Sequence, residues 1–139
     1  MKKLVIVLMF LFPIVIISQG NNNPRKFIEA NVGLASTYGY DWDEPFPGLS
    51  VLFGKTYANN GLVTEWQAGI AAPSVLTLKF FLGGGNLDRN VGIAVRNWPL
   101  FVGPQMKVDK FTCSFEVGTN TELSFDSGLI ITFGYRWEF

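Results

Sequence analysis

The residues best suited to chemistry are charged side chains that stand at alternate positions in otherwise apolar segments. Four are acidic and four are basic: Glu29, Glu65, Glu116, Glu138, Lys79, Arg96, Lys107 and Arg136. Neighbouring carboxylates and bases suit general acid–base catalysis or a proton path, but balanced opposite charges also form structural ion pairs. The chain has no histidine, which removes serine–histidine catalysis and the commonest metal ligand. We therefore interpret the eight as a structural, lumenal ion-pair network, and predict no enzyme activity and no cofactor.

Other candidate sites contain fewer residues suited to catalysis or binding. The segment Gly83-Gly84-Gly85-Asn86 has the composition of a phosphate loop but lacks the Gly-Lys-Ser/Thr ending, so we interpret it as a turn. Cys113 is the only cysteine, so neither an intramolecular disulfide nor a cysteine-rich metal site can form. A net charge of zero offers no basic patch for nucleic acid.

An acidic and aromatic segment over residues 38–47 has two interpretations. It holds the residues Tyr40, Asp41, Trp42, Asp43 and Glu44 together with two prolines, and we expect a long loop. The carboxylates could chelate Ca²⁺ or meet the divalent cations of lipopolysaccharide, since clustered carboxylates suit hard cations. Their spacing matches no complete calcium motif, so a solvated interaction loop flanked by interfacial aromatics is the alternative.

The elements that must position the charged residues are strands, because apolar and polar residues alternate with a period of two. The pattern predicts strands over about 27–35, 49–57, 62–71, 76–82, 90–97, 102–109, 111–118 and 128–139. Tight turns are expected at 58–61, 83–86 and 109–110, and a bulge or a delayed strand start at Pro104, which cannot donate to a ladder. The sequence thus predicts an all-β, closed, antiparallel, up-and-down barrel of eight strands.

The alternation does not by itself decide which face lies inside. With charges inside, the apolar face meets lipid and the interior is plugged by side chains, since eight strands leave room for little else. With apolar residues inside, the chain is a soluble secreted barrel or sandwich that binds an apolar ligand, as lipocalin-like folds do.

The last strand favours the first interpretation. Tyr135, Trp137 and Phe139 stand at alternate positions and Phe139 ends the sequence. This pattern resembles the C-terminal assembly signal of bacterial outer-membrane β-barrel proteins, and the whole alternation is similar to the small eight-stranded barrels of the outer-membrane β-barrel domain family, with a Bacteroidetes-like lead-in. The resemblance implies a barrel in the outer membrane of a Gram-negative cell, with a structural or surface-interaction role. It implies contacts with membrane lipid, lipopolysaccharide and the barrel assembly machinery.

The N-terminus points to export. Met1-Lys2-Lys3 precedes an apolar run from Leu4 to Ile17, which is too short to span a membrane as a helix and has the form of a secretory signal peptide. We expect a cleaved signal over residues 1–20 and a barrel domain over 21–139. With the C-terminus in the periplasm, the connections at 38–47, 72–74, 97–100 and 119–127 would face outside.

Overall fold

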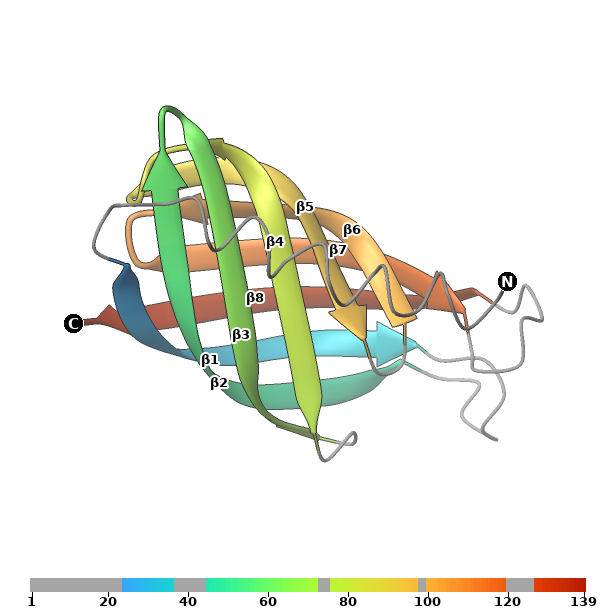
Figure 1. Cartoon of the computed structure of the whole chain (residues 1–139). Helices are drawn as coiled ribbons and strands as arrows, with labels where there is room; N and C mark the ends of the chain where they lie inside the picture. Colours follow the sequence, from blue (N-terminus) through green and yellow to red (C-terminus); the bar gives the residue numbers. More distant parts are fainter. Residues whose placement is uncertain (1–23, 37–44, 73–75, 98–99, 120–126) are drawn as a thin grey trace, which may run out of the picture.

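The described residues form a closed β-barrel. A computed structural model describes residues 24–36, 45–72, 76–97, 100–119 and 127–139, and the expected signal peptide and residues 38–44 of the expected acidic loop lie outside these ranges. Within them the strands are β1 Arg25–Ser36, β2 Phe46–Asn59, β3 Leu62–Ala72, β4 Thr77–Gly85, β5 Arg89–Asn97, β6 Leu100–Val108, β7 Phe111–Thr119 and β8 Ser127–Glu138. Each strand pairs antiparallel with the next, and β8 pairs with β1 (Figure 1). The predicted eight-stranded, up-and-down barrel is confirmed.

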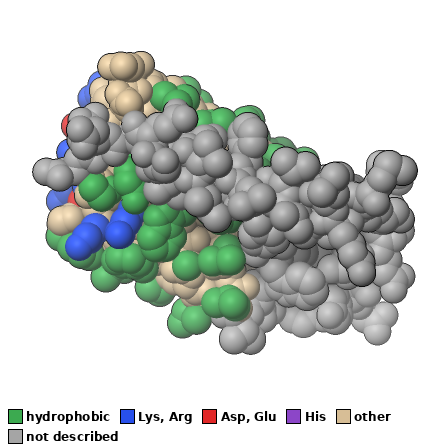
Figure 2. Space-filling view, viewed as in Figure 1, with side chains coloured by type: hydrophobic (Ala, Val, Ile, Leu, Met, Phe, Trp, Pro, Cys, Tyr) green, Lys and Arg blue, Asp and Glu red, His purple; other side chains and the backbone are tan. Residues whose placement is uncertain are grey.

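Strand alternation divides the side chains into an inner and an outer set, because successive residues of a strand point to opposite faces. The inner set is largely polar and buried, and it includes Glu29, Lys79, Glu116 and Arg136. Most of the outer set is apolar, as the hydrophobic side chains over the described part of the visible face indicate (Figure 2). Of the two faces that the sequence left open, the charged one is therefore inside. None of the described residues form a helix long and apolar enough to cross a membrane.

Three tight connections and the end of the chain gather at one end of the barrel, which we call the turn end. Asn60 and Gly61 join β2 to β3 with φ of 49° and 82°, the left-handed conformations that a two-residue hairpin turn requires. Asp109, with φ of 53°, takes part in the turn between β6 and β7. The Asn86 side chain accepts hydrogen bonds from the backbone N–H groups of Asp88 (2.9 Å) and Arg89 (2.8 Å), which closes the β4–β5 turn. The opposite end of the barrel is called the loop end.

Backbone hydrogen bonds also connect the turn end around its rim. Gly85 N–H donates to Gly61 O at 2.9 Å, and Asp109 N–H donates to Asp88 O at 2.7 Å. These bonds join the β2–β3 hairpin to the β4–β5 hairpin and the β4–β5 hairpin to the β6–β7 hairpin, so the three turns are linked rather than independent.

The predicted turn at Gly83-Gly84-Gly85-Asn86 is wrong in its extent, because β4 continues to Gly85. Gly83 lies opposite Gly92 of β5 in the ladder. A Cβ atom at Gly83 would stand 2.6 Å from Cζ of Phe81 and closer still to the carbonyl oxygen of Val91. Glycine at this position therefore allows close packing inside a strand rather than a reversal of the chain.

Two proline expectations are also wrong. Pro47, expected in a loop, pairs with Leu34 near the start of β2, where a missing N–H is tolerated. Pro104 produces neither a bulge nor a delayed start. Val102 pairs with Val117 and Gln105 with Ser114, so equal numbers of residues intervene on β6 and β7. β6 already begins at Leu100, and the ladder passes the proline in register.

Candidate functional site

Among the described residues, the largest fully buried side chain is Arg136 of β8, and it binds two carboxylates. Its Nη1 and Nη2 each donate to a carboxylate oxygen of Glu65 on β3 at 2.6 Å, a bidentate pair, and its Nε donates to Glu29 on β1. We call Arg136, Glu29 and Glu65 the Arg136 cluster. The guanidinium reaches across the lumen, because β8 and β3 are not neighbours in the barrel. Planar, two-pronged pairing of this kind fixes both geometry and charge.

Neutral side chains complete the Arg136 cluster. Thr56 is the cross-strand partner of Glu65, and its hydroxyl donates to Glu65 Oε2 at 2.7 Å. The amide of Gln67 donates to Glu65 Oε1. The ring of Phe27 lies beneath the guanidinium, 4.0 Å from ring centroid to Cζ, in a cation–π arrangement. Glu65 thus accepts hydrogen bonds from three side chains, as a buried carboxylate requires.

A second cluster has the opposite composition, with one carboxylate between two cations. Glu116 of β7 pairs with Lys79 of β4 at 2.7 Å and with Arg96 of β5 at 3.0 Å. We call these three residues the Glu116 cluster. Ser114 donates to Glu116 Oε1 at 2.8 Å and accepts a hydrogen bond from Lys79 Nζ at 3.2 Å. Arg96 Nη1 also donates to the hydroxyl of Thr77 at 3.4 Å. This cluster lies in the half of the barrel toward the loop end.

A third group of charges closes the turn end. Glu138 pairs with Lys107 and, at 3.0 Å, with Arg25, which also contacts Asp88 at 2.5 Å. Lys107 Nζ also donates to the carbonyl oxygen of Leu87. The hydrogen bond from the Arg25 guanidinium, followed by its charge, lowers the pKa of the exposed Asp88 carboxyl below its ordinary value. We call Arg25, Asp88, Lys107 and Glu138 the rim cluster.

All eight charged residues singled out in the sequence lie in these clusters, but they do not form one network among the described residues. The sequence did not single out Thr56, Ser114 or Phe27, although each stands at an inner position of its strand and could have been found by parity. Arg25 and Asp88 were also missed. Asp88 lies in a turn, where alternation gives no signal.

Ion pairs connect opposite walls of the lumen. Arg136 connects β8 with β3, and Lys79 connects β4 with β7, so side chains cross the barrel at two levels. Each carboxylate of the Arg136 and Glu116 clusters has at least one cationic partner. Such paired groups are suited to holding opposite walls together.

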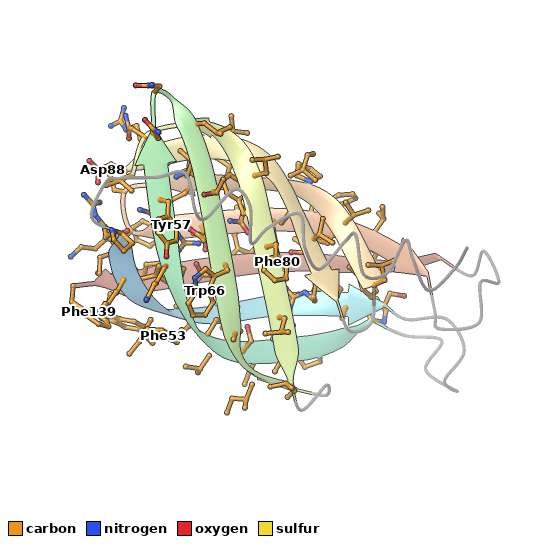
Figure 3. All side chains as sticks on the ribbon, viewed as in Figure 1. Phe53, Tyr57, Trp66, Phe80, Asp88 and Phe139 are labelled. Atoms are coloured by element: carbon orange, nitrogen blue, oxygen red, sulfur yellow. The ribbon has the colours of Figure 1, made fainter. Side chains whose placement is uncertain are left out.

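The outer surface near the turn end carries the aromatic residues of the last strand. Tyr135 packs edge-to-face against Trp137 at 5.0 Å and against Phe111 of β7 at 5.3 Å between ring centroids. Phe139 is exposed at the end of β8, and Phe53, Trp66 and Phe80 stand on the outer wall of β2, β3 and β4 (Figure 3).

The acidic segment Tyr40, Asp41, Trp42, Asp43 and Glu44 lies outside the described residues, so both of its interpretations stay open. Among the residues that the structure does describe, no group of three or more carboxylate or cysteine side chains is placed to hold a metal ion. No protein-family model matches the chain, and searches of curated proteins and of solved structures gave no match either. Its function is therefore argued from the barrel and its side chains.

Proposed function

We propose that the chain is a small integral membrane barrel of the Gram-negative outer membrane, with a structural or surface-interaction role. The observation that carries the proposal is the inverted distribution of side chains. Charged residues are buried in the lumen, whereas large apolar residues cover the outside. Membrane barrels have this distribution, since lipid replaces the core as the apolar environment.

The outer apolar set is extensive and is spread around the barrel. Its most exposed members include Phe111, Phe139, Ile70, Leu76, Leu49, Val91, Phe133 and Val32. A water-soluble protein rarely exposes a continuous apolar surface of this kind. The buried apolar cluster of Val63, Phe81 and Ala94 is small by comparison. A lipocalin-like ligand cavity needs the reverse distribution, so these features favour the membrane proposal over that alternative.

The two ends of the barrel suit different sides of the membrane. Membrane barrels of bacteria place short turns in the periplasm and longer loops outside. In this proposal the turn end, with Asn60-Gly61 and Phe139, faces the periplasm. The segment 38–47 then faces the exterior as the surface-interaction loop, next to lipopolysaccharide.

The contacts inside the lumen favour a role other than the conduction of ions or solutes. The cross-barrel contacts of Arg136 and Lys79 occupy the interior, and an eight-stranded barrel has space for little more than side chains. Folded protein in a planar lipid bilayer is therefore expected to produce no discrete conductance steps.

Assembly is proposed to use the last strand. Tyr135, Trp137 and Phe139 would be recognised by the barrel assembly machinery after a signal over residues 1–20 has directed export. Deletion of Phe139 is expected to reduce the outer-membrane level of the protein at matched expression, while precursor without its signal accumulates in the periplasm. Unchanged levels of the deletion variant would argue against this part of the proposal.

The experiment that tests the proposed location is fractionation of cells that express the full chain. The protein is expected to remain with membranes after a carbonate wash, to require detergent for extraction, and to run faster on a gel before boiling than after it, because a closed barrel stays compact. Folded protein recovered in the soluble fraction without detergent would contradict the membrane proposal and favour the soluble barrel.

A further inference from the structure

The charged residues that face outward from the described strands share one sign and one end of the barrel. In the described strands, the outward-facing charged residues are Lys26 of β1, Lys55 of β2 and Arg89 of β5. Each lies close to the turn end, whereas the acidic residues of the described strands occupy inner positions: Glu29, Glu65, Glu116 and Glu138. Basic side chains are visible among apolar ones on the face shown in Figure 2.

Two of these basic residues face each other. Lys26 and Lys55 are direct cross-strand partners in the β1–β2 ladder. Like charges at opposed positions on one face of a sheet destabilise it unless another group compensates them. None of the ion pairs in the described part of the chain includes either lysine. The pair therefore presents two positive charges on the outer surface of the barrel.

Two acidic residues near this end are already engaged elsewhere, and the third, Asp109 in the β6–β7 turn, forms no ion pair with either lysine in the described part of the chain. Glu138 is bonded to Arg25 and Lys107 on the inner side of the wall, and Asp88 is bonded to Arg25. The compensating negative charge for the lysine pair is therefore expected from outside the chain.

Aromatic residues lie on both sides of the lysine pair. Trp66 of β3 is the cross-strand partner of Lys55, and Trp66 also stacks edge-to-face with Phe53 at 6.0 Å between centroids (Figure 3). On the other side, the backbone N–H of Phe139 donates to Lys26 O at 3.0 Å. Aromatic rings concentrate at the headgroup level of a membrane, and lysine stems extend along apolar surface to reach phosphates there.

We propose that Lys26 and Lys55 together bind the phosphate of an anionic glycerophospholipid in the leaflet next to the turn end. The inference rests on the proposed membrane location and adds a specific lipid site to it. The two ammonium groups can both donate hydrogen bonds to the oxygens of the singly charged phosphodiester, the flanking rings contact the glycerol and upper acyl region, and the apolar wall beyond contacts the chains. A free anion in water would use only the first of these features.

The test is native mass spectrometry of the folded full chain in detergent, titrated with phosphatidylglycerol or with phosphatidylcholine. Wild type is expected to retain phosphatidylglycerol at lower lipid concentration than phosphatidylcholine. Replacement of either lysine by glutamine should weaken the affinity for phosphatidylglycerol about fivefold. The attraction of one basic residue to an anionic lipid surface corresponds to a change in affinity of about this size. The Lys26→Gln/Lys55→Gln variant should then bind both lipids alike.

Arg89→Gln is the matched control, since it removes one outward positive charge at the same end but from β5. It should keep the preference for phosphatidylglycerol, as should Lys26→Arg/Lys55→Arg. If the double glutamine variant folds with a heat-modifiable gel shift and still prefers phosphatidylglycerol, or if Arg89→Gln loses the preference equally, the site proposal is overturned while the membrane proposal stands. A wild-type chain that folds without detergent and enters no vesicle would instead overturn the membrane proposal.

Discussion

The Arg136 and Glu116 clusters both pair buried charges in the lumen, but their compositions are opposite. In one, a single arginine holds two glutamates, and in the other a single glutamate holds a lysine and an arginine. The first therefore has one net negative charge and the second one net positive charge. The Arg136 cluster lies toward the turn end and the Glu116 cluster toward the loop end. The comparison indicates that charge is balanced over the lumen as a whole rather than within each cluster.

The clusters also differ in their neutral support. Arg136 lies over the ring of Phe27 and makes a bidentate contact with Glu65, so its geometry is fixed by a planar fork. Glu116 relies on Ser114, which links it to Lys79 through hydroxyl hydrogen bonds. Loss of the central residue should therefore be more damaging in the Arg136 cluster, because Glu29 has Arg136 as its side-chain partner among the described residues. After loss of Glu116, by contrast, Lys79 and Arg96 keep Ser114 and Thr77.

The largest effect is expected from Arg136→Met. This change leaves two buried carboxylates without their cation and removes the contact with Phe27. The free energy of unfolding, measured by urea titration in detergent micelles, should fall by about 3 to 5 kcal/mol. A loss below about 1 kcal/mol would mean that the cluster is hydrated and not a buried support.

A smaller effect is expected from Glu116→Gln. The glutamine keeps the shape and can still accept a hydrogen bond, while Lys79 and Arg96 retain Ser114 and Thr77 as neutral acceptors. The same titration should give a loss of about 2 to 3 kcal/mol. If this variant is less stable than Arg136→Met, the proposed ranking of the two clusters is wrong.

Removal of the net negative charge of the Arg136 cluster should lower the free energy of unfolding less than either of these changes. Glu29→Gln leaves Arg136 paired with Glu65 through both prongs, so the Arg136 cluster becomes neutral. The free energy of unfolding of the Glu29→Gln variant should stay within about 1 kcal/mol of wild type. Glu65→Gln is the matched control, because it removes the bidentate partner, and it should be the more damaging of the two. Equal losses for both would contradict the assignment of Glu29 as the excess charge.

The smallest effect concerns the rim cluster and depends on pH. The pKa of Asp88 is lowered in the folded chain by the hydrogen bond from Arg25, so the pair adds stability that is present above the unfolded pKa of about 4. That contribution is lost as the pH falls through the folded pKa. Unfolding midpoints of wild type and Asp88→Asn, followed from pH 7 to pH 2, should differ at neutral pH and converge in acid. A constant difference would exclude titration of Asp88 as the cause.

Parity was sufficient to predict the eight strands and eight of the inner charged residues, although Arg25 at the start of β1 was missed. Strand alternation is a local property, so Glu65 and Arg136 could be assigned to one face from their own segments alone. Their partnership could not be predicted, because it depends on how far strands β8 and β3 are shifted and tilted when the barrel closes. The sequence therefore indicated one balanced network where the structure has separate clusters.

Backbone details were harder to predict for a different reason. Glycine and proline are typical of turns, but both also occur inside strands where the neighbouring strands accommodate them. Their own segment of sequence does not distinguish the two cases. Gly83 stays in β4 because the ring of Phe81 needs the space. Pro104 stays in register because it pairs with Ile93 of β5 while Val102 and Gln105 keep their pairs with β7. Both outcomes are set by cross-strand neighbours, which local sequence does not reveal.

The central claim is that the apolar outer wall faces lipid, and Trp66 tests it most directly. A variant that keeps Trp66 while Trp42, Trp98 and Trp137 are replaced by phenylalanine would be folded into vesicles that contain lipids brominated along the acyl chain. Strong quenching of Trp66 fluorescence by the brominated chains, with little quenching by aqueous acrylamide, is the expected result. Efficient acrylamide quenching without an effect of the brominated lipids, in a protein with a barrel circular dichroism spectrum, would contradict it.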